Sequence, residues 1–205
     1  MTDEVEGRPP LTREAIIEAA RARVVSDGPD GVSLRPLAAS LGVTAPALYA
    51  HFDSKRHLLA AVAADELEAL GRRMAEAAVG VDDPIERIKA QSRAYVDHAR
   101  AHPALFEVLF LHQPVWSADP STVPAADHSG EAEASRVFAE GAAGIADAVA
   151  AGLLRGPDPV LASLTIWSAV HGVATIVARG PGLDAAYESA LVDSVIDAIV
   201  DGLRP

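Results

Sequence analysis

The sequence of 205 residues contains no cysteine. This absence excludes disulfide bonds, thiolate ligands for zinc or iron–sulfur clusters, and a thiol nucleophile. Aromatic residues make up only 4% of the chain, so alanine, leucine, valine and isoleucine must build the core. Alanine-rich stretches with little alternation of β-branched residues favour helices over strands. We therefore expect an all-α fold.

Acidic residues outnumber basic residues, and the net charge of −12 by itself argues against binding to nucleic acid. The charge is unevenly distributed, however. Residues 7–60 contain seven basic and five acidic side chains, whereas residues 61–205 contain ten basic and 21 acidic ones. A mildly basic N-terminal part on an acidic body indicates where a polyanion would bind.

The sequence gives little support for a membrane location. Residues 1–10 are acidic and lack the apolar segment of a secretory signal, and we expect them to form a flexible arm. Residues 160–178 carry no charge and approach the length of a membrane span. They include serine, threonine and histidine and lack flanking basic clusters, so a helix buried in a bundle or a dimer interface explains them better. We expect a cytoplasmic protein without a membrane partner.

Turn residues and apolar spacing divide the chain into about nine helices. Two domains are expected, with residues 1–60 as a small N-terminal head and residues 61–205 as a larger helical bundle. A stretch rich in proline at 113–130 is interpreted as a loop, either a lid or a plain connection. The expected helices are 11–27, 34–41, 45–51, a long one opened by Lys55, 84–102, 104–112, 131–154, 158–179 and 184–203.

Residues 34–51 have the pattern of a helix-turn-helix. Gly42 joins two short helices with the permissive backbone that a tight turn requires. Ser33 and Thr44 are the expected N-caps. In such a motif the second helix lies in the major groove of DNA and the first crosses the backbone. Lys55 places a cation where it opposes the dipole of the next helix, which indicates a phosphate-binding role more than a stabilising one.

This head resembles the DNA-binding head of the TetR family of bacterial repressors. The resemblance covers roughly residues 11–60. It is carried by Tyr49-Ala50-His51-Phe52-Asp53-Ser54-Lys55, preceded by Leu34-Arg35-Pro36-Leu37-Ala38 and Leu41-Gly42-Val43. Taken singly, Tyr49 would be a half-buried aromatic residue, His51 a surface histidine and Lys55 a solvated charge. Together, at this spacing, they indicate DNA binding.

The resemblance also implies roles for single residues. Tyr49, His51 and Lys55 would hold phosphates, and Thr44 would add a hydroxyl or backbone contact. The base-facing positions lack arginine, asparagine and glutamine, so specificity would depend on thymine methyl groups, on Tyr49 or Arg35, and on DNA shape. The predicted DNA-binding residues are Ser33, Arg35, Thr44, Ala45, Pro46, Ala47, Tyr49, His51 and Lys55.

A second, shorter resemblance lies in the body. Trp167-Ser168-Ala169-Val170-His171-Gly172, with Pro103-Ala104-Leu105-Phe106 upstream, is similar to a TetR subgroup that carries a Trp-x-x-x-His-Gly signature. The resemblance implies a homodimer through the last two helices and a cavity for a small-molecule effector, although the same side chains are equally compatible with plain core. The expected ligand-binding residues are Leu70, Met74, Tyr95, His98, Phe106, Leu109, Phe110, Trp116, Phe138, Trp167 and His171.

Two other chemistries receive less support. His98 and His102 are four residues apart, with His112 nearby, which is a spacing compatible with a metal site. The glutamate of an HExxH motif is missing, so we interpret these histidines as surface or pocket residues and expect no metal and no cofactor. No glycine-rich phosphate loop, nucleophile elbow or pair of carboxylates supports an enzyme.

The sequence thus predicts a homodimeric, ligand-responsive transcriptional regulator. We expect it to repress by binding double-stranded operator DNA and to leave that DNA when a small, largely apolar effector binds. The alternative is an all-α small-molecule-binding protein without operator-specific DNA binding. Activation instead of repression is also compatible with the sequence.

Overall fold

The computed structural model describes residues 11–111, 141–155, 158–180 and 182–205. Within these ranges every regular element is helical, which confirms the expected all-α fold. The predicted flexible arm (1–10) and the predicted loop (113–130) lie outside the described residues.

The head contains three helices, α1 (Arg13–Asp27), α2 (Leu34–Ser40) and α3 (Ala45–Tyr49), with a 3₁₀ turn at Pro29–Gly31. Thr12 begins α1 as expected, because its hydroxyl accepts a hydrogen bond from the Ala15 amide at 3.1 Å. Between α2 and α3, Gly42 has a φ of 61°, so the turn uses the left-handed conformation that glycine adopts without strain. These elements form the helix-turn-helix that the sequence predicts.

The first turns of α2 and α3 differ from the expectation in one respect. Neither Ser33 nor Thr44 makes a side-chain capping hydrogen bond. A capping oxygen accepts from the second or third amide of a helix, and in both helices a proline, Pro36 or Pro46, removes one of those donors. The two hydroxyls are therefore not engaged as helix caps.

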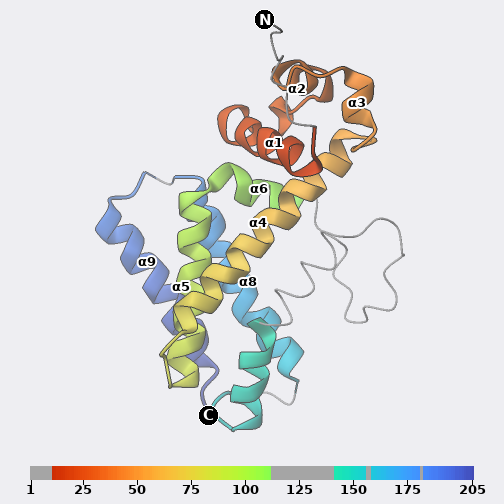
Figure 1. The fold of residues 1–205 in the computed structure, drawn as a ribbon. Helices are drawn as coiled ribbons and strands as arrows, with labels where there is room; N and C mark the ends of the chain where they lie inside the picture. The colour runs from red at the N-terminus through yellow and green to blue at the C-terminus, as the bar shows by residue number, and fades with distance from the viewer. Residues whose placement is uncertain (1–10, 112–140, 156–157, 181) are drawn as a thin grey trace, which may run out of the picture.

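Helix α4 (Lys55–Ala78) connects the head to the body, as Figure 1 shows. Lys55 is its first residue, as predicted, and Ser54 caps it by accepting a hydrogen bond from the His57 amide at 3.1 Å. One face of α4 is buried along both parts of the molecule, from Leu58 in the head to Leu70 in the body. Because α4 runs through residue 60, the domain boundary there stays an interpretation.

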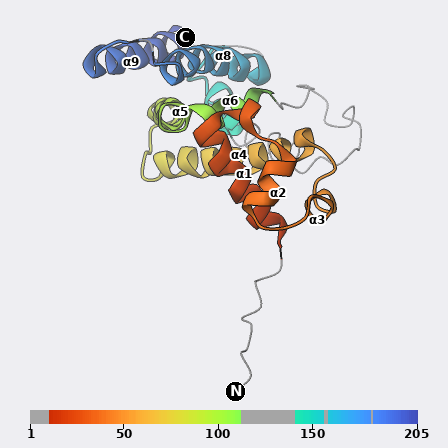
Figure 2. The ribbon, with the colours of Figure 1, turned by 90° about the horizontal axis from the view of Figure 1, so that it is seen from above.

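The body is layered on α4. Helix α5 (Pro84–Ala101) lies on α4, and α6 (Pro103–Leu111) packs beside both. Helices α8 (Pro159–Ala178) and α9 (Ala185–Gly202) lie side by side on the opposite face of α5, so that they form the outer layer in Figure 2. A shorter apolar helix spans Gly141–Ala150. The order of layers is therefore α4, then α5, then the pair α8 and α9.

Helix α8 contains the uncharged stretch seen in the sequence. By length and composition alone it could cross a membrane, but 39% of its apolar window is buried inside the fold. Its buried side chains, among them Ile166, Val170 and Val173, belong to the core that α8 shares with α5 and α9. This arrangement agrees with the expected helix of a bundle.

The acidic residues of α9 pair with basic residues of α5. Lys89 on α5, whose side chain is only 8% exposed, lies 2.9 Å from Asp197 and 3.0 Å from Asp201. Arg93 on α5 lies 2.7 Å from Asp193. Burial would lower the pKa of Lys89, but the hydrogen bonds to the two aspartates raise it above its usual value. Helix α9 is therefore joined to α5 by a row of ion pairs.

Candidate functional site

The predicted DNA-binding residues gather on one surface of the head. Ser33, Arg35, Tyr49 and Lys55 line a single open hollow of about 380 Å³, together with Val32, Leu34, Asp53 and Ser54. The hollow lies between the start of α2, the end of α3 and the start of α4. Residues that the sequence placed in three separate elements therefore share one concave surface.

None of the nine predicted DNA-binding residues is buried. Tyr49 is 45% exposed, and Ser33, Arg35, Thr44, Pro46 and Ala47 are also exposed. The remaining three, Ala45, His51 and Lys55, are half-buried. Beneath them, Leu48 and Phe52 are fully buried. The helix-turn-helix therefore has one solvent-exposed outer face and one buried apolar inner face.

Contacts from α1 and the 3₁₀ turn fix this surface. The guanidinium of Arg13 lies 4.3 Å from the centre of the Phe52 ring, and its Nη1 donates a hydrogen bond to the His51 carbonyl at 3.3 Å. The Lys55 ammonium donates to the Asp30 carbonyl at 3.0 Å. Both cations are thus held at the end of the motif, where a phosphate would approach.

Asp53 is the one acidic side chain in the hollow. Its carboxylate accepts a hydrogen bond from the Ser54 hydroxyl at 2.9 Å and lies 3.2 Å from Nδ1 of His57. The hydrogen bond from Ser54, opposed by slight burial and reinforced by His57, lowers the pKa of Asp53. Asp53 is therefore ionised at neutral pH, and Arg35 and Lys55 must outweigh its charge for the hollow to attract a phosphate.

Four of the predicted ligand-binding residues form one ring cluster in the body. Tyr95 packs edge-on against Phe106, with ring centres 5.6 Å apart, and Trp167 stacks on His171 at 5.0 Å. Phe106 lies 5.8 Å from His171, and the Tyr95 hydroxyl lies 3.1 Å from His171 Nδ1. Helices α5, α6 and α8 each contribute to this ring cluster, in which three aromatic residues pack around one histidine.

The polar groups of the ring cluster are kept neutral. Burial lowers the pKa of the His171 imidazole. Burial also raises the pKa of the Tyr95 hydroxyl well above its usual value, against a smaller opposing effect of Trp167. A neutral phenol beside a neutral imidazole can orient an uncharged polar group of a ligand without binding a charged one.

The other predicted ligand-binding residues do not join the ring cluster. Leu70 and Leu109 are buried in the core, and Met74 is half-buried where α4 faces the helix Gly141–Ala150. The side chains of Phe110, Trp116 and Phe138 lie outside the described residues. His98 of α5 contacts Glu66 on α4 instead.

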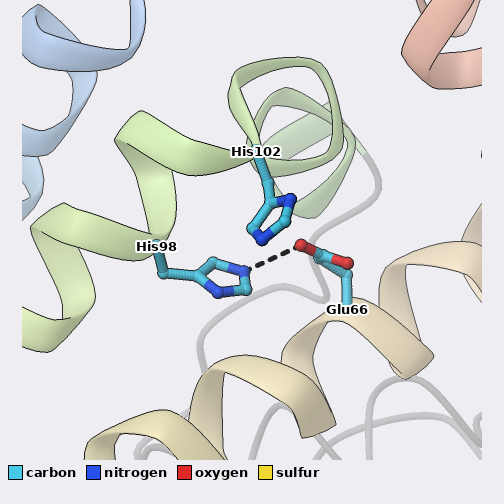
Figure 3. Close-up of side chains that lie close together, drawn as sticks. All are labelled: Glu66, His98 and His102. Carbon is cyan, nitrogen blue, oxygen red and sulfur yellow. Dashed lines mark ion pairs between the residues drawn. The ribbon is translucent and has the colours of Figure 1, made fainter.

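His98 belongs to a polar cluster that sequence reasoning found only in part. His98 and His102 face Glu66 on α4, and one ligand atom from each residue lies within 4.8 Å of the other two (Figure 3). Nε2 of His98 is 2.8 Å from Oε1 of Glu66. Glu66 is completely buried, yet nothing in the sequence around it distinguishes it from a surface glutamate.

Arg21 of α1 extends the cluster to the head. Its guanidinium pairs with Oε2 of Glu66, the oxygen that does not face His98. Burial would raise the pKa of Glu66, but His98 and Arg21 more than offset this and lower it. The pKa of His102 is lowered, first by burial and also by nearby cations. Glu66 is therefore an ionised carboxylate in the core, at the junction of the head and the body.

Comparison with known proteins agrees with this architecture. Residues 16–62 match the family described as bacterial regulatory proteins, tetR family, and residues 88–202, more than half of the chain, match the tetracyclin repressor-like C-terminal domain. An HTH-type transcriptional regulator of Mycobacterium tuberculosis is 28% identical over 189 residues, which cover 91% of this chain and 79% of the relative.

Solved structures show the same fold. A protein from Rhodococcus sp. RHA1 superposes with a TM-score of 0.78 at 25% identity, with all of both chains covered. A variant of TetR from Acinetobacter baumannii, solved in complex with minocycline, has a TM-score of 0.65 at 18% identity, covering 94% of this chain and 96% of that one. With both family matches in the expected order along the sequence, this chain belongs to the TetR family of transcriptional regulators, which join a DNA-binding helix-turn-helix to a ligand-binding C-terminal domain.

Proposed function

We propose that this regulator is a repressor that binds its operator as a homodimer in the bacterial cytoplasm and leaves it when a small, largely apolar ligand binds. The observation that carries the proposal is the hollow on the head. Ser33, Arg35, Tyr49 and Lys55 come from three elements, and they share one exposed surface beside α3. Such a surface has the hydroxyl and cationic donors that a DNA backbone requires.

The outer layer of the body supports the dimer. In Figure 2 no described element covers the far side of α8 and α9. Apolar side chains remain exposed there, including Leu161 at 61% and Ile176 at 48%, and Leu191 and Val195 of α9 are only half-buried. Two copies joined through these helices would form a four-helix bundle. Such a dimer would present two α3 helices to half-sites about 34 Å apart, which one copy cannot do.

The ring cluster supports an apolar effector. Tyr95, Phe106 and Trp167 offer aromatic surface, and His171 adds one neutral polar group. The A. baumannii neighbour, which shares this fold, was solved in complex with minocycline, a small molecule. To release DNA, the effector must bind the released conformation more tightly than the DNA-bound one, since equal affinity for both would shift nothing.

DNA binding is tested first, by a mobility-shift titration of the purified chain on the DNA upstream of its own gene. We expect specific binding that weakens steeply with salt. In Lys55→Ala, affinity should fall for every sequence alike, and the slope of log affinity against log salt should decrease by about one, because one phosphate contact is lost.

Arg72→Ala is the matched control, because Arg72 is an exposed cation of α4 in the body and pairs with Glu68. It should leave both affinity and salt slope unchanged. An unchanged slope in Lys55→Ala would remove Lys55 from the DNA surface. A wild-type chain that ignores the duplex at low salt would favour the alternative, a ligand-binding protein without operator-specific DNA binding.

A further inference from the structure

The cluster of Glu66, His98 and His102 is set apart from both proposed sites. It lies between α4 and α5 and shares no residue with the hollow or the ring cluster (Figure 3). Two imidazoles and one carboxylate converge there from two helices. His98 and His102 are four residues apart at the end of α5, so both rings project to the same side.

The buried atoms of this cluster are poorly satisfied. Glu66 is 0% exposed and His98 is 1% exposed. Among the described residues, neither carboxylate oxygen of Glu66 and neither ring nitrogen of His98 makes a hydrogen bond of ordinary geometry, although Arg21 and His98 lie close to the carboxylate. Buried polar groups are normally hydrogen-bonded, and a buried charge is normally paired or bound to a metal ion. Two of these atoms, Oε1 of Glu66 and Nε2 of His98, face each other beside His102 (Figure 3).

The two oxygens of Glu66 have different neighbours. Oε2 faces the Arg21 guanidinium, and Oε1 faces His98 at 2.8 Å. Arg21 therefore holds the carboxylate from behind and leaves Oε1 directed at the histidines. An outer partner of this kind, which orients a ligating side chain, is typical of protein metal sites.

We propose that Glu66, His98 and His102 bind a divalent transition-metal cation of the zinc class. Two histidines and one carboxylate are a known zinc ligand set that leaves a coordination position open. Imidazole ligands favour zinc, nickel or iron over magnesium and calcium, which prefer oxygen ligands. Oε1 of Glu66 and Nε2 of His98 are the donors of the buried half of the site, and His102 completes it.

Binding requires only a small adjustment. Metal bonds of about 2.0 to 2.2 Å place neighbouring donors closer together than the widest separation here, 4.8 Å. His102 can close this gap, because it is half-buried and lies at the C-terminal cap of α5, where the helical backbone ends. Arg73, whose Nη2 lies 3.2 Å from Nε2 of His102, is exposed and can turn to solvent. Arg21 and Arg73 oppose the cation, so the site is weaker than one made of anionic ligands alone.

The test is a titration of the untagged, full-length chain with Co²⁺, followed through its visible d–d absorption, and then with Zn²⁺ in competition with a chromophoric chelator. The wild type should bind one equivalent per chain at this site. His102→Ala should weaken binding by at least 100-fold, since loss of an outer partner alone costs about 10- to 100-fold. Glu66→Gln should act in the same direction while keeping the shape of the buried side chain.

His57→Ala is the matched control. His57 is also a half-buried histidine of α4, but it lies beside Phe52 and Asp53 in the head. The His57→Ala variant should therefore bind metal as the wild type does.

Zn²⁺ should also raise the melting temperature of the wild type and not that of His102→Ala. The half-buried position of His102 keeps this comparison valid even if Glu66→Gln does not fold. Absence of binding by the wild type, or equal binding by wild type and His102→Ala, overturns the proposal. Because the readout involves no DNA, the result is independent of the proposed repressor function.

Discussion

The head and the body of this regulator place their polar side chains in opposite ways. In the head, Ser33, Arg35 and Tyr49 point outward, and the inner face is apolar. In the body, Lys89 and Glu66 point inward and find partners on other helices. The polar side chains of the head that have partners there find them close by, as Lys55 does at the Asp30 carbonyl and Asp53 at Ser54 and His57. A body that must hold several long helices together uses some of its charges between them.

The largest loss of stability is expected from a substitution in the apolar core of the head. Phe52 is completely buried and supports the Arg13 guanidinium. Phe52→Ala should lower the free energy of unfolding by about 3 to 5 kcal/mol, because it removes a whole ring from a small core. Urea denaturation followed by circular dichroism measures this change. Val25→Ala, at a side chain of α1 that is 62% exposed, should stay within about 0.5 kcal/mol of the wild type.

A smaller loss is expected from the charged contacts of the body. Lys89→Met keeps most of the side-chain volume but leaves Asp197 and Asp201 without their shared cation. The aspartates are about half-exposed and water screens them, so the loss should be about 1 to 2 kcal/mol. Arg204→Ala removes an exposed partner of the same Asp201 and should have a much smaller effect. Equal losses from the two variants would show that burial of Lys89 is unimportant.

The ring cluster should make stability depend on pH in a defined direction. Burial lowers the pKa of His171, so the unfolded chain takes up this proton more readily than the folded one. The contribution of His171 is complete above the unfolded pKa of about 6.5 and is lost as pH falls toward the lowered folded value. His171→Gln should therefore flatten the change in unfolding free energy between pH 7.5 and 5.5. An identical slope in wild type and variant would contradict this assignment.

The smallest change in unfolding free energy is expected when an exposed ion pair on the surface of α4 is removed. Arg72 and Glu68 form an exposed pair four residues apart in the favourable order, with glutamate first. Arg72→Ala should change the unfolding free energy by less than about 0.5 kcal/mol, a difference that salt should remove. A loss comparable to that of Lys89→Met would mean that exposed and interhelical charges contribute alike.

Local signals in the sequence predicted most of the head. Gly42 in the turn, the motif from Tyr49 to Lys55 and the position of Lys55 at the start of α4 all depend on neighbours within a few residues. Ser33 and Thr44 are the N-cap residues of α2 and α3 as predicted, but neither side chain makes a capping hydrogen bond, because Pro36 and Pro46 each remove one amide that could have donated it. This difference is also local, since each proline lies within three residues of its cap.

The body was harder to predict because its decisive contacts join distant residues. The partners of Asp193 and Asp201 of α9 lie 100 and 112 residues away in the sequence, on α5. The residues next to Glu66 in the sequence do not indicate that it is buried, since its partners come from α1 and α5. All four residues of the ring cluster were among the predicted ligand-binding residues. Trp167 and His171 are four residues apart on one helix, whereas Tyr95 and Phe106 reach them only through the packing of α5 and α6.

The row of ion pairs on α5 also bears on the covalent chemistry of the chain. Its only two lysines are Lys55, on the surface proposed to meet DNA, and Lys89. The Lys89 amine is buried between two aspartates and has a raised pKa, so at neutral pH almost none of it is an accessible nucleophile. Amine-selective acylating reagents should therefore modify Lys55 far faster than Lys89. If DNA binds the head as proposed, it should slow the acylation of Lys55. The extent of lysine labelling would then report whether the operator is occupied.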